Sequence, residues 1–252
     1  TLDGKTVTAI GDYAFARCSS LTSVSIPDSV TSFGDGAFFA CDSLTSITIP
    51  DSVVQIGENP FTSCSSLKII SVSPEHLYFA AIDGVLFRKA DKALISYPAG
   101  IKSPTYTIPQ GITSIGVAAF SRCKSLTSIT IPDGVTSIGK EAFSGCSSLT
   151  SVIIPDSVTS IGHGAFYDCT SLKSIMLPNG VTSIGDDAFS SCKSLTSITI
   201  PDSVTNIGDR TFSSCYSLKS ITLPNDVTSI GNYMFYGCSK LKNFTIPDSI
   251  TG

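Results

Sequence analysis

The residue types that most often carry chemistry in proteins recur in this sequence at a fixed spacing. Nine cysteines follow one another at a constant interval, with one longer step, and lie at positions 18, 41, 64, 123, 146, 169, 192, 215 and 238. Neighbouring thiols could form disulfides, but the number of cysteines is odd. Each cysteine also follows the phenylalanine of its repeat by three residues, which places it beside a residue that we expect in the core. There is no C-x-x-C pair and no Cys/His cluster with zinc spacing. Because cysteine often acts as a small buried hydrophobic residue, we expect a ladder of buried thiols.

Histidines and carboxylates form no recognisable catalytic set. His76 lies beside Glu75, and His163 occupies a variable slot that is elsewhere lysine or aspartate; neither has a nucleophile and an orienting group with it. An acidic or amide residue follows the repeated proline, at Asp28, Asp51, Asp133, Asp156, Asn179, Asp202, Asn225 and Asp248. Stacked carboxylates could bind Ca²⁺, but one carboxylate per repeat favours hydrogen bonding in Asx turns. We therefore expect a protein that is not an enzyme and has no metal or cofactor.

Composition excludes several classes of partner. The 252 residues include 16 basic and 20 acidic side chains, a net charge of −4, and lack any basic run. A mildly acidic chain of this kind is unsuited to binding the phosphates of nucleic acid. No apolar stretch approaches the ~20 residues that span a bilayer, so we expect no membrane insertion in this segment. The first residues resemble no signal peptide and both ends fall within a repeat, which suggests a mature or truncated fragment.

The elements that carry these residues belong to one repeated unit, L-x-x-I-x-I-P-x-x-V-x-x-I-G-x-x-A-F-x-x-C-x-x. In residues 126–132, LTSITIP, alternating apolar and polar residues predict a strand, which the proline ends. V-x-x-I-G predicts a second short strand, and residues 140–146, KEAFSGC, are compatible with a short helical turn that buries phenylalanine and cysteine. A repeat in the range of roughly 20–29 residues with this leucine spacing is typical of a leucine-rich-repeat solenoid, in which stacked coils share one core.

The repeat extends over the whole chain, so we expect one solenoid domain over residues 1–252. It contains nine full coils, from 21–43 to 218–240, and a partial coil at each end. The coil at 67–102 is enlarged. Its Asp83–Gly84 pair, between two apolar runs, is a strong two-residue hairpin signal, and residues 90–93, ADKA, suggest a second turn. We therefore predict a small antiparallel meander in this coil.

The repeat pattern resembles the BspA-type leucine-rich repeats of bacterial and protozoan surface proteins, and the segment 82–98, IDGVLFRKADKALISYP, is similar to an element that recurs in them. The resemblance implies a cell-surface or secreted protein that takes part in adhesion, often to extracellular-matrix proteins such as fibronectin and fibrinogen. The family pattern consists of scaffold residues, so it assigns no binding residues in this chain.

Two surfaces are candidates for binding a protein ligand. The first is the exposed face of the parallel sheet, where serine and threonine are joined by lysine in the later coils; its residues are Lys173, Lys219, Lys242, Thr130, Thr199 and Thr222. Such a face could attract an acidic partner, although lysines there would also serve solubility alone. The second is the meander, whose aromatic residues are Tyr78, Phe79, Phe87 and Tyr97. These aromatics could instead fill the core of the enlarged coil.

Noncatalytic adhesion is the function that this combination favours. The main alternative is a structural role, in which nearly identical coils associate end to end into a filament or surface layer. A Ser/Thr lattice that binds ice is a third possibility, but Ile153 and Met176 interrupt the lattice. Asn243 begins a glycosylation sequon.

Overall fold

The computed structural model describes residues 5–250. Contacts within the chain divide it into two compact units: unit 1 is Thr1–Ile101 with Gly116–Cys123, and unit 2 is Lys102–Ile115 with Lys124–Gly252. Both units are built from the predicted solenoid coils, in which equivalent residues of successive repeats pair with one another. A single solenoid domain over residues 1–252 stays a prediction, and the outermost residues of its partial end coils, 1–4 and 251–252, lie outside the described residues.

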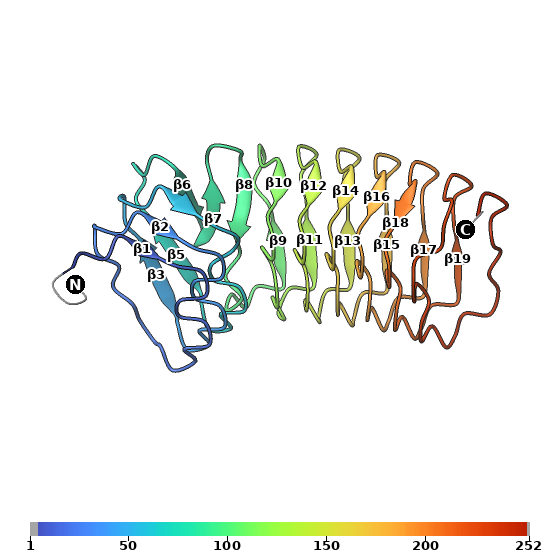
Figure 1. The fold of residues 1–252 in the computed structure, drawn as a ribbon, viewed down its shortest axis with the longest axis horizontal. Coiled ribbons are helices and arrows are strands. Elements are labelled where there is room, and N and C mark those ends of the chain that lie inside the picture. The colour runs from blue at the N-terminus through green and yellow to red at the C-terminus, as the bar shows by residue number, and fades with distance from the viewer. Residues whose placement is uncertain (1–4, 251–252) are drawn as a thin grey trace. The chain divides into compact units, whose positions relative to one another are not determined.

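Unit 2 contains a six-stranded parallel sheet with one strand from each coil (Figure 1). Equivalent residues of successive coils pair in register, for example Ile129 with Val152. The order of the strands in the sheet follows the chain, because each coil stacks on the one before it. The strands are β9 (Thr105–Thr107), β11 (Ser128–Thr130), β13 (Ser151–Ile153), β15 (Ser174–Met176), β17 (Ser197–Thr199) and β19 (Ser220–Thr222).

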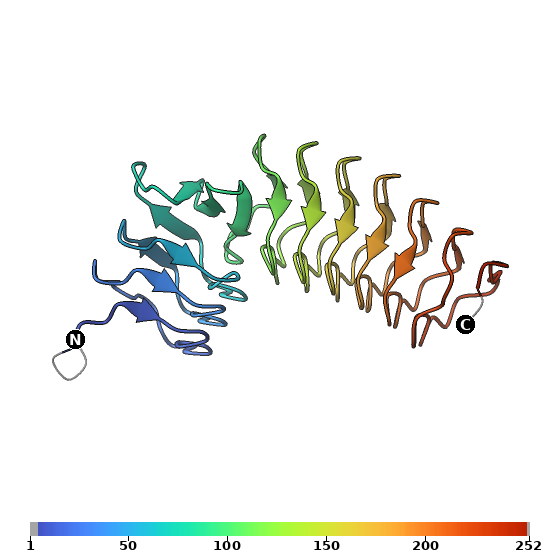
Figure 2. The same cartoon turned by 45° about the horizontal axis from the view of Figure 1, so that its top comes forward.

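A second row of two-residue strands runs along another side of unit 2, as predicted from V-x-x-I-G. Each places one isoleucine in the core and ends at the glycine that follows. The rows of coils are visible as separate loops in Figure 2. The strands are β10 (Ser114–Ile115), β12 (Ser137–Ile138), β14 (Ser160–Ile161), β16 (Ser183–Ile184) and β18 (Asn206–Ile207).

The expected short helical turn is not formed, and no helix occurs among residues 5–250. In residues 140–146 a chain of turns takes its place. The N–H groups of Glu141, Phe143 and Gly145 donate to carbonyls of the next coil at 2.7–2.8 Å, whereas those of Ala142 and Ser144 donate to carbonyls three residues earlier. Because every second N–H is committed to the neighbouring coil, the segment cannot form the continuous ladder of an α-helix.

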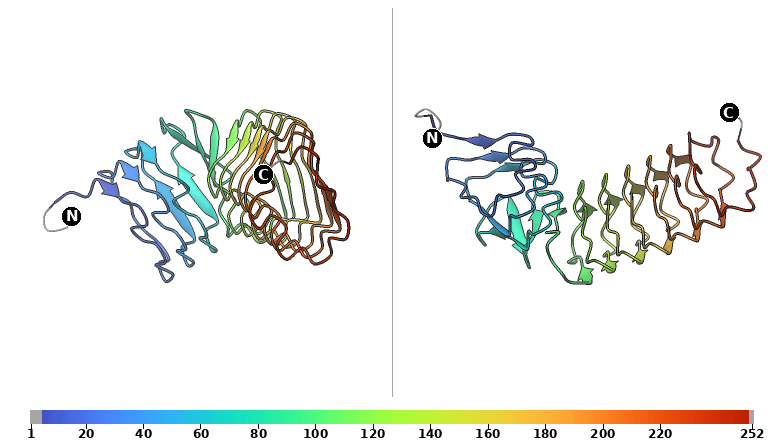
Figure 3. Two further views of the ribbon diagram at one scale, coloured as in Figure 1. Left: turned by 45° about the vertical axis from the view of Figure 1, so that its right-hand side comes forward. Right: turned by 90° about the horizontal axis from the view of Figure 1, so that it is seen from below.

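The core of unit 2 is a column of stacked phenylalanine rings beside the buried cysteines. Phe166 lies between Phe143 and Phe189, with ring centroids 5.2 and 5.4 Å away and planes within 7° of parallel. All three rings are fully buried. The left view of Figure 3 looks along the coils of unit 2 and shows how closely they superimpose, which is why identical side chains meet.

Unit 1 repeats this plan in its first coils. A three-stranded parallel sheet contains β1 (Ala9–Ile10), β2 (Ser32–Phe33) and β4 (Gln55–Ile56), and a two-stranded parallel sheet contains β3 (Ser46–Ile49) and β5 (Ile69–Val72). Phe38 stacks between Phe15 and Phe61 at 5.3 and 5.7 Å, so the aromatic column is also present here.

The enlarged coil forms the predicted antiparallel meander of β6 (Phe79–Ile82), β7 (Val85–Arg88) and β8 (Ala93–Ser96). Asp83 and Gly84 both have positive φ, as a two-residue hairpin turn requires. A Cβ on Gly84 would lie 3.1 Å from Ile69 Cα, so the turn packs closely on β5. The second turn is held by a bidentate pair, in which Arg88 donates to both carboxylate oxygens of Asp91 at 2.9 and 2.7 Å.

Candidate protein-binding surface

The outward face of the six-stranded sheet is formed by the side chains that alternate with core residues. In β11 the middle residue, Ile129, is 5% exposed, whereas Thr130 points to solvent. Since strands pair in register, equivalent outward side chains form columns across the sheet. The predicted residues Thr130, Thr199 and Thr222 all lie exposed in one such column, so unit 2 brings them onto a single face.

The three predicted lysines form a second, parallel column. Lys173, Lys219 and Lys242 are exposed, and backbone bonds fix their spacing: Thr196 N–H donates to Lys173 O at 3.2 Å, Lys219 N–H to Thr196 O at 3.0 Å and Lys242 N–H to Lys219 O at 3.4 Å. Among the described residues these lysines take part in no ion pair. The outward positions of strands β9 to β19 contain no carboxylate. The lysine column therefore places positive charge along the side of this face where the strands begin, in a chain whose net charge is negative.

Two apolar side chains stand at the middle of the threonine column. Ile153 and Met176 are each 79% exposed and face each other across the β13–β15 pair. Exposed apolar residues inside a polar surface are common at protein interfaces, where methionine is also enriched. In the sequence the two residues stood out only as interruptions of a Ser/Thr lattice; their position between threonines of the same column was the signal that they belong to this face.

The prediction of an aromatic surface on the meander was wrong for three of its four residues. Phe79, Phe87 and Tyr97 are 1–4% exposed and belong to the core, while Tyr78 is 43% exposed. Tyr97 stacks on Phe120 with ring centroids 5.0 Å apart. It lies one repeat period before Phe120 and so takes the place of the repeat's phenylalanine, a spacing that already marked it as a core residue. The enlarged coil needs these rings to fill its greater volume.

His76 is a structural residue of the meander, 1% exposed. Its Nδ1 accepts hydrogen bonds from Tyr78 N–H and Phe79 N–H, each at 3.2 Å, and its Nε2 lies 3.2 Å from the carbonyl oxygen of Pro50. Nδ1 therefore carries no proton, and Nε2–H is the donor to Pro50. This arrangement uses both ring nitrogens to fix the entry of the chain into β6. His163, in contrast, is exposed as expected.

The buried thiol ladder is confirmed for the inner coils. Seven cysteines, from Cys41 to Cys215, are buried, Cys238 is half-buried and Cys18 is exposed. Most of the thiols donate to the carbonyl of the phenylalanine in the preceding coil, as Cys192 does to Phe166 O at 3.2 Å, and Cys123 donates to the carbonyl of Tyr97. Burial raises the pKa of the Cys64 and Cys215 thiols to about 12. Such thiols stay protonated at neutral pH and serve as core residues.

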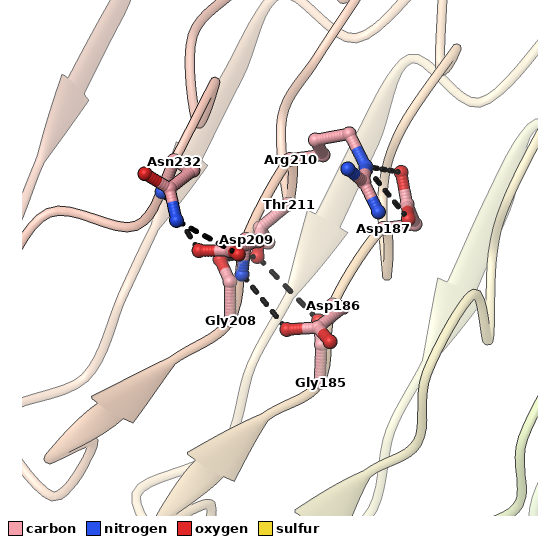
Figure 4. Close-up of polar contacts among 8 residues, drawn as sticks. All are labelled: Gly185, Asp186, Asp187, Gly208, Asp209, Arg210, Thr211 and Asn232. Atoms are coloured by element: carbon pink, nitrogen blue, oxygen red, sulfur yellow. Dashed lines mark hydrogen bonds and ion pairs between the residues drawn. The ribbon is translucent and has the colours of Figure 1, made fainter.

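The carboxylates that bind backbone groups are not those that follow the proline. There, as at residues 27–30, the turn is closed by Val30 N–H donating to Pro27 O at 3.0 Å, and the Asx-turn bonds we expected are not formed among the described residues. The aspartates that follow the repeat's glycine instead link neighbouring coils (Figure 4). Asp186 Oδ1 accepts from Asp209 N–H at 2.8 Å, and Asp209 Oδ1 accepts from Asn232 N–H at 2.7 Å.

This post-glycine ladder recurs in unit 1, where Asp12 accepts from Asp35 N–H at 2.8 Å and Asp35 from Glu58 N–H at 2.7 Å. The ladder was not predicted from the sequence, although acidic residues one repeat apart after glycine were the signal. The Asn232 side chain also donates to Asp209 Oδ2 at 3.1 Å, and these bonds from Asn232 lower the pKa of Asp209. Because these carboxylates accept hydrogen bonds from the backbone of the next coil and so join the coils, their role is structural.

Other kinds of site have little support in the geometry. Within residues 5–250, no three His, Cys, Asp or Glu side chains come together in a group that could hold a metal ion. Nor does that part of the chain contain a helix long and apolar enough to cross a membrane. The sheet face of unit 2 is therefore the candidate surface that combines the predicted residues with exposure and a distinct charge.

Comparison with known families now identifies the repeat. The profile of the BspA type leucine rich repeat region matches residues 3–103, 99–217 and 136–252, with six copies. The chain belongs to the BspA-type leucine-rich-repeat family. The resemblance inferred from the repeat pattern is thus confirmed, and with it the fold class.

Solved structures of bacterial repeat proteins share the fold of this BspA-type chain. A leucine rich cell surface protein from Faecalibacterium prausnitzii A2-165 is 41% identical with a TM-score of 0.80, over 85% of this chain and 57% of that one. A leucine-rich repeat protein from Eubacterium ventriosum is 27% identical with a TM-score of 0.68, over 94% and 82% of the two chains. The pneumococcal vaccine antigen PcpA, 24% identical with a TM-score of 0.63 over 98% and 66%, shows the fold alone.

The chain spans 57% of the length of the Faecalibacterium protein, so the two are similar over a shared repeat region. No curated protein matches the sequence.

Proposed function

We propose that this BspA-type chain is a noncatalytic, cell-surface or secreted adhesion module that binds a partner protein through the sheet face of unit 2. The observation that carries the proposal is the composition of that face: three exposed lysines without an ion pair among the described residues, and two exposed apolar side chains, with no carboxylate at the outward positions of β9 to β19. The Faecalibacterium relative is described as a cell surface protein, and this description supports an extracellular location for the present chain.

The partner that suits this face is an acidic protein surface. Six strands ~4.8 Å apart extend roughly 24 Å, a width that suits a protein surface better than a small ligand. Ile153 and Met176 would lose water on contact, and the lysine column would steer a negatively charged partner toward them. Repeat proteins commonly bind through such extended sheet faces. Extracellular-matrix proteins are the first partners to test.

The test is binding to immobilised fibronectin, fibrinogen and collagen at low and high salt. We expect saturable binding that weakens with salt, because the lysines are exposed to screening. Replacing Lys173, Lys219 and Lys242 by glutamate should weaken binding at least ~10-fold, since each charge reversal at an interface rim costs about 0.5–1 kcal/mol or more.

A matched control uses three other lysines of unit 2, Lys124, Lys140 and Lys193, also replaced by glutamate. Both triple variants change the net charge equally, so equal losses would show that total charge, and not this face, controls binding. Binding whose affinity is the same at low and high salt would also argue against the lysine-bearing sheet face as the binding surface.

The alternative, a self-assembling structural repeat, predicts a different result. The protein would bind none of these partners but would form larger species as its concentration rises, which light scattering measures.

A further inference from the structure

The sheet formed by β3 and β5 in unit 1 is open on one side. Among the described residues β3 pairs with β5 alone, although residues 21–27 of the preceding coil have the strand sequence LTSVSIP. In unit 2 the corresponding contact is made: Ile108 N–H donates to Thr130 O at 3.0 Å. Residues 21–27 form no strand in the structure, so no strand pairs with β3 on that side.

The separation is confined to the strand segments 21–27 and 44–50, because the residues just before and just after these two segments are hydrogen-bonded to each other. Ser43 N–H donates to Ser19 O at 3.1 Å, and Ser52 Oγ donates to Val30 O at 2.7 Å. The pairing of β2 with β4 then continues the contact. The opening is therefore bounded at both ends.

A hollow of about 860 Å³ lies at this opening, lined by three successive coils of unit 1. Ser25 and Ile26 lie on the side of the first coil, and Thr48 and Ile49 belong to β3. In a parallel strand, residues direct their N–H and C=O groups alternately to the two sides. Thr130 directs its carbonyl toward the preceding coil, so the equivalent Thr48 directs its backbone groups toward the open edge.

The charge of the hollow selects among extended ligands. Two carboxylates, Asp28 and Asp51, line it together with several serine hydroxyls, and none of the described lining side chains is cationic. Lysine or arginine on a bound strand would meet these carboxylates, whereas an acidic strand would be repelled. The apolar side chains of Val24 and Ile26 are half-buried there and offer contact area for a small apolar residue.

We propose that this hollow binds an extended basic peptide segment of a partner protein, which adds as a strand to the open edge of β3. Backbone hydrogen bonds to the edge would supply affinity, and the two carboxylates would supply the preference for basic side chains. β3 has four residues, so the ordered part of the peptide would extend roughly 13 Å. The site lies in unit 1 and does not depend on the sheet face of unit 2.

The test uses a fluorescein-labelled heptapeptide with blocked ends, Val-Lys-Val-Lys-Val-Lys-Val, and follows its fluorescence anisotropy with the full chain. We expect saturable binding, and at least ~10-fold weaker binding of the same peptide with glutamate in place of lysine. A peptide of the same charge that is N-methylated at alternate residues should also bind at least ~10-fold more weakly, because it has lost the backbone donors that strand addition needs.

Matched variants locate the site. The Asp28→Asn/Asp51→Asn variant should bind the lysine peptide ~10-fold more weakly, whereas Asp133→Asn/Asp156→Asn, which changes the same post-proline slots in unit 2, should bind it like the wild type. Hydrogen exchange of residues 46–49 should slow when the peptide is bound. Absence of saturable binding, equal binding of the N-methylated peptide, or equal losses in the two variant pairs would each overturn the proposal.

These results are independent of the proposed function. Loss of matrix-protein binding in the lysine variants tests unit 2, and the peptide comparison with wild-type protein tests unit 1 even if an aspartate variant fails to fold.

Discussion

The two units use the same repeat sequence but complete it to different extents. In unit 2 every strand from β11 to β17 pairs with a strand on each side, and the result is a continuous face of columns. In unit 1, within the described residues, the coil at 21–43 leaves β3 unpaired on one side, and the meander replaces the regular turn segment of the coil at 67–102. A repeat sequence thus defines what each coil can pair with, while its neighbours decide whether the pairing occurs.

The largest expected effect is the difference in stability between a substitution inside the phenylalanine column and one at its end. Phe166→Ala should lower the free energy of unfolding by about 3–5 kcal/mol, because it leaves a cavity between two stacked rings. Phe15→Ala should cost only about 1–2 kcal/mol, since Phe15 is half-buried and stacks on Phe38. Urea titration of both variants measures the difference, and equal losses would show that the end of the column is as tightly packed as its interior.

Next in size is the effect of the histidine that anchors the meander. His76→Ala should destabilise unit 1 by about 1–3 kcal/mol, because the N–H groups of Tyr78 and Phe79 lose their buried acceptor. Hydrogen exchange should accelerate in β6 to β8 and stay unchanged in β11 to β15. His163→Ala, at an exposed position of unit 2, should change stability by less than about 0.5 kcal/mol. Uniform acceleration over both units would contradict this role.

A smaller effect is a gain of stability where the post-glycine ladder is interrupted. Val117, Lys140 and His163 occupy its slot in the middle coils and provide no carboxylate or amide oxygen. His163→Asn should add about 0.5–1 kcal/mol, because the new side chain can accept from Asp186 N–H as Asp186 does from Asp209 N–H. Asn232 shows that asparagine fits this slot. The melting temperatures of His163→Asn and His163→Ala test the proposal, and identical values would refute it.

The smallest effect is the pH dependence of the same ladder. Hydrogen bonds from Asn232 lower the pKa of Asp209 below its ordinary value, so the unfolded chain takes up this proton at a higher pH than the folded chain. The resulting stability is fully present above the ordinary aspartate pKa of about 3.9 and is lost as the pH falls through the lower, folded value. The stability difference between wild type and Asp209→Asn, measured in urea from neutral pH to about pH 3, should therefore decrease toward acid. A constant difference would mean that the carboxylate is not stabilised in the folded state.

Position in the repeat predicted most of the fold and part of the candidate surface. The outward position of Thr199 followed from strand alternation, because alternation decides which side of a strand a residue occupies. Lys173 lies just before β15, and its exposure followed from its equivalence to other polar positions of the repeat. The burial of Phe79 and Phe87 did not follow, since the meander has no repeat register from which to infer a direction. Tyr97 differs from these two, because the repeat register did mark it as a core residue.

What the sequence by itself determined is the coil: its period, its strands, its thiol and phenylalanine columns and the hairpin at Asp83–Gly84. These features depend on contacts between identical positions of adjacent coils, and the repeat encodes such contacts directly. Only the tertiary structure decided that His76 fixes the meander and that β3 keeps an open edge. Each of these depends on the distance between particular coils, which a repeated pattern cannot specify because it is the same in every coil.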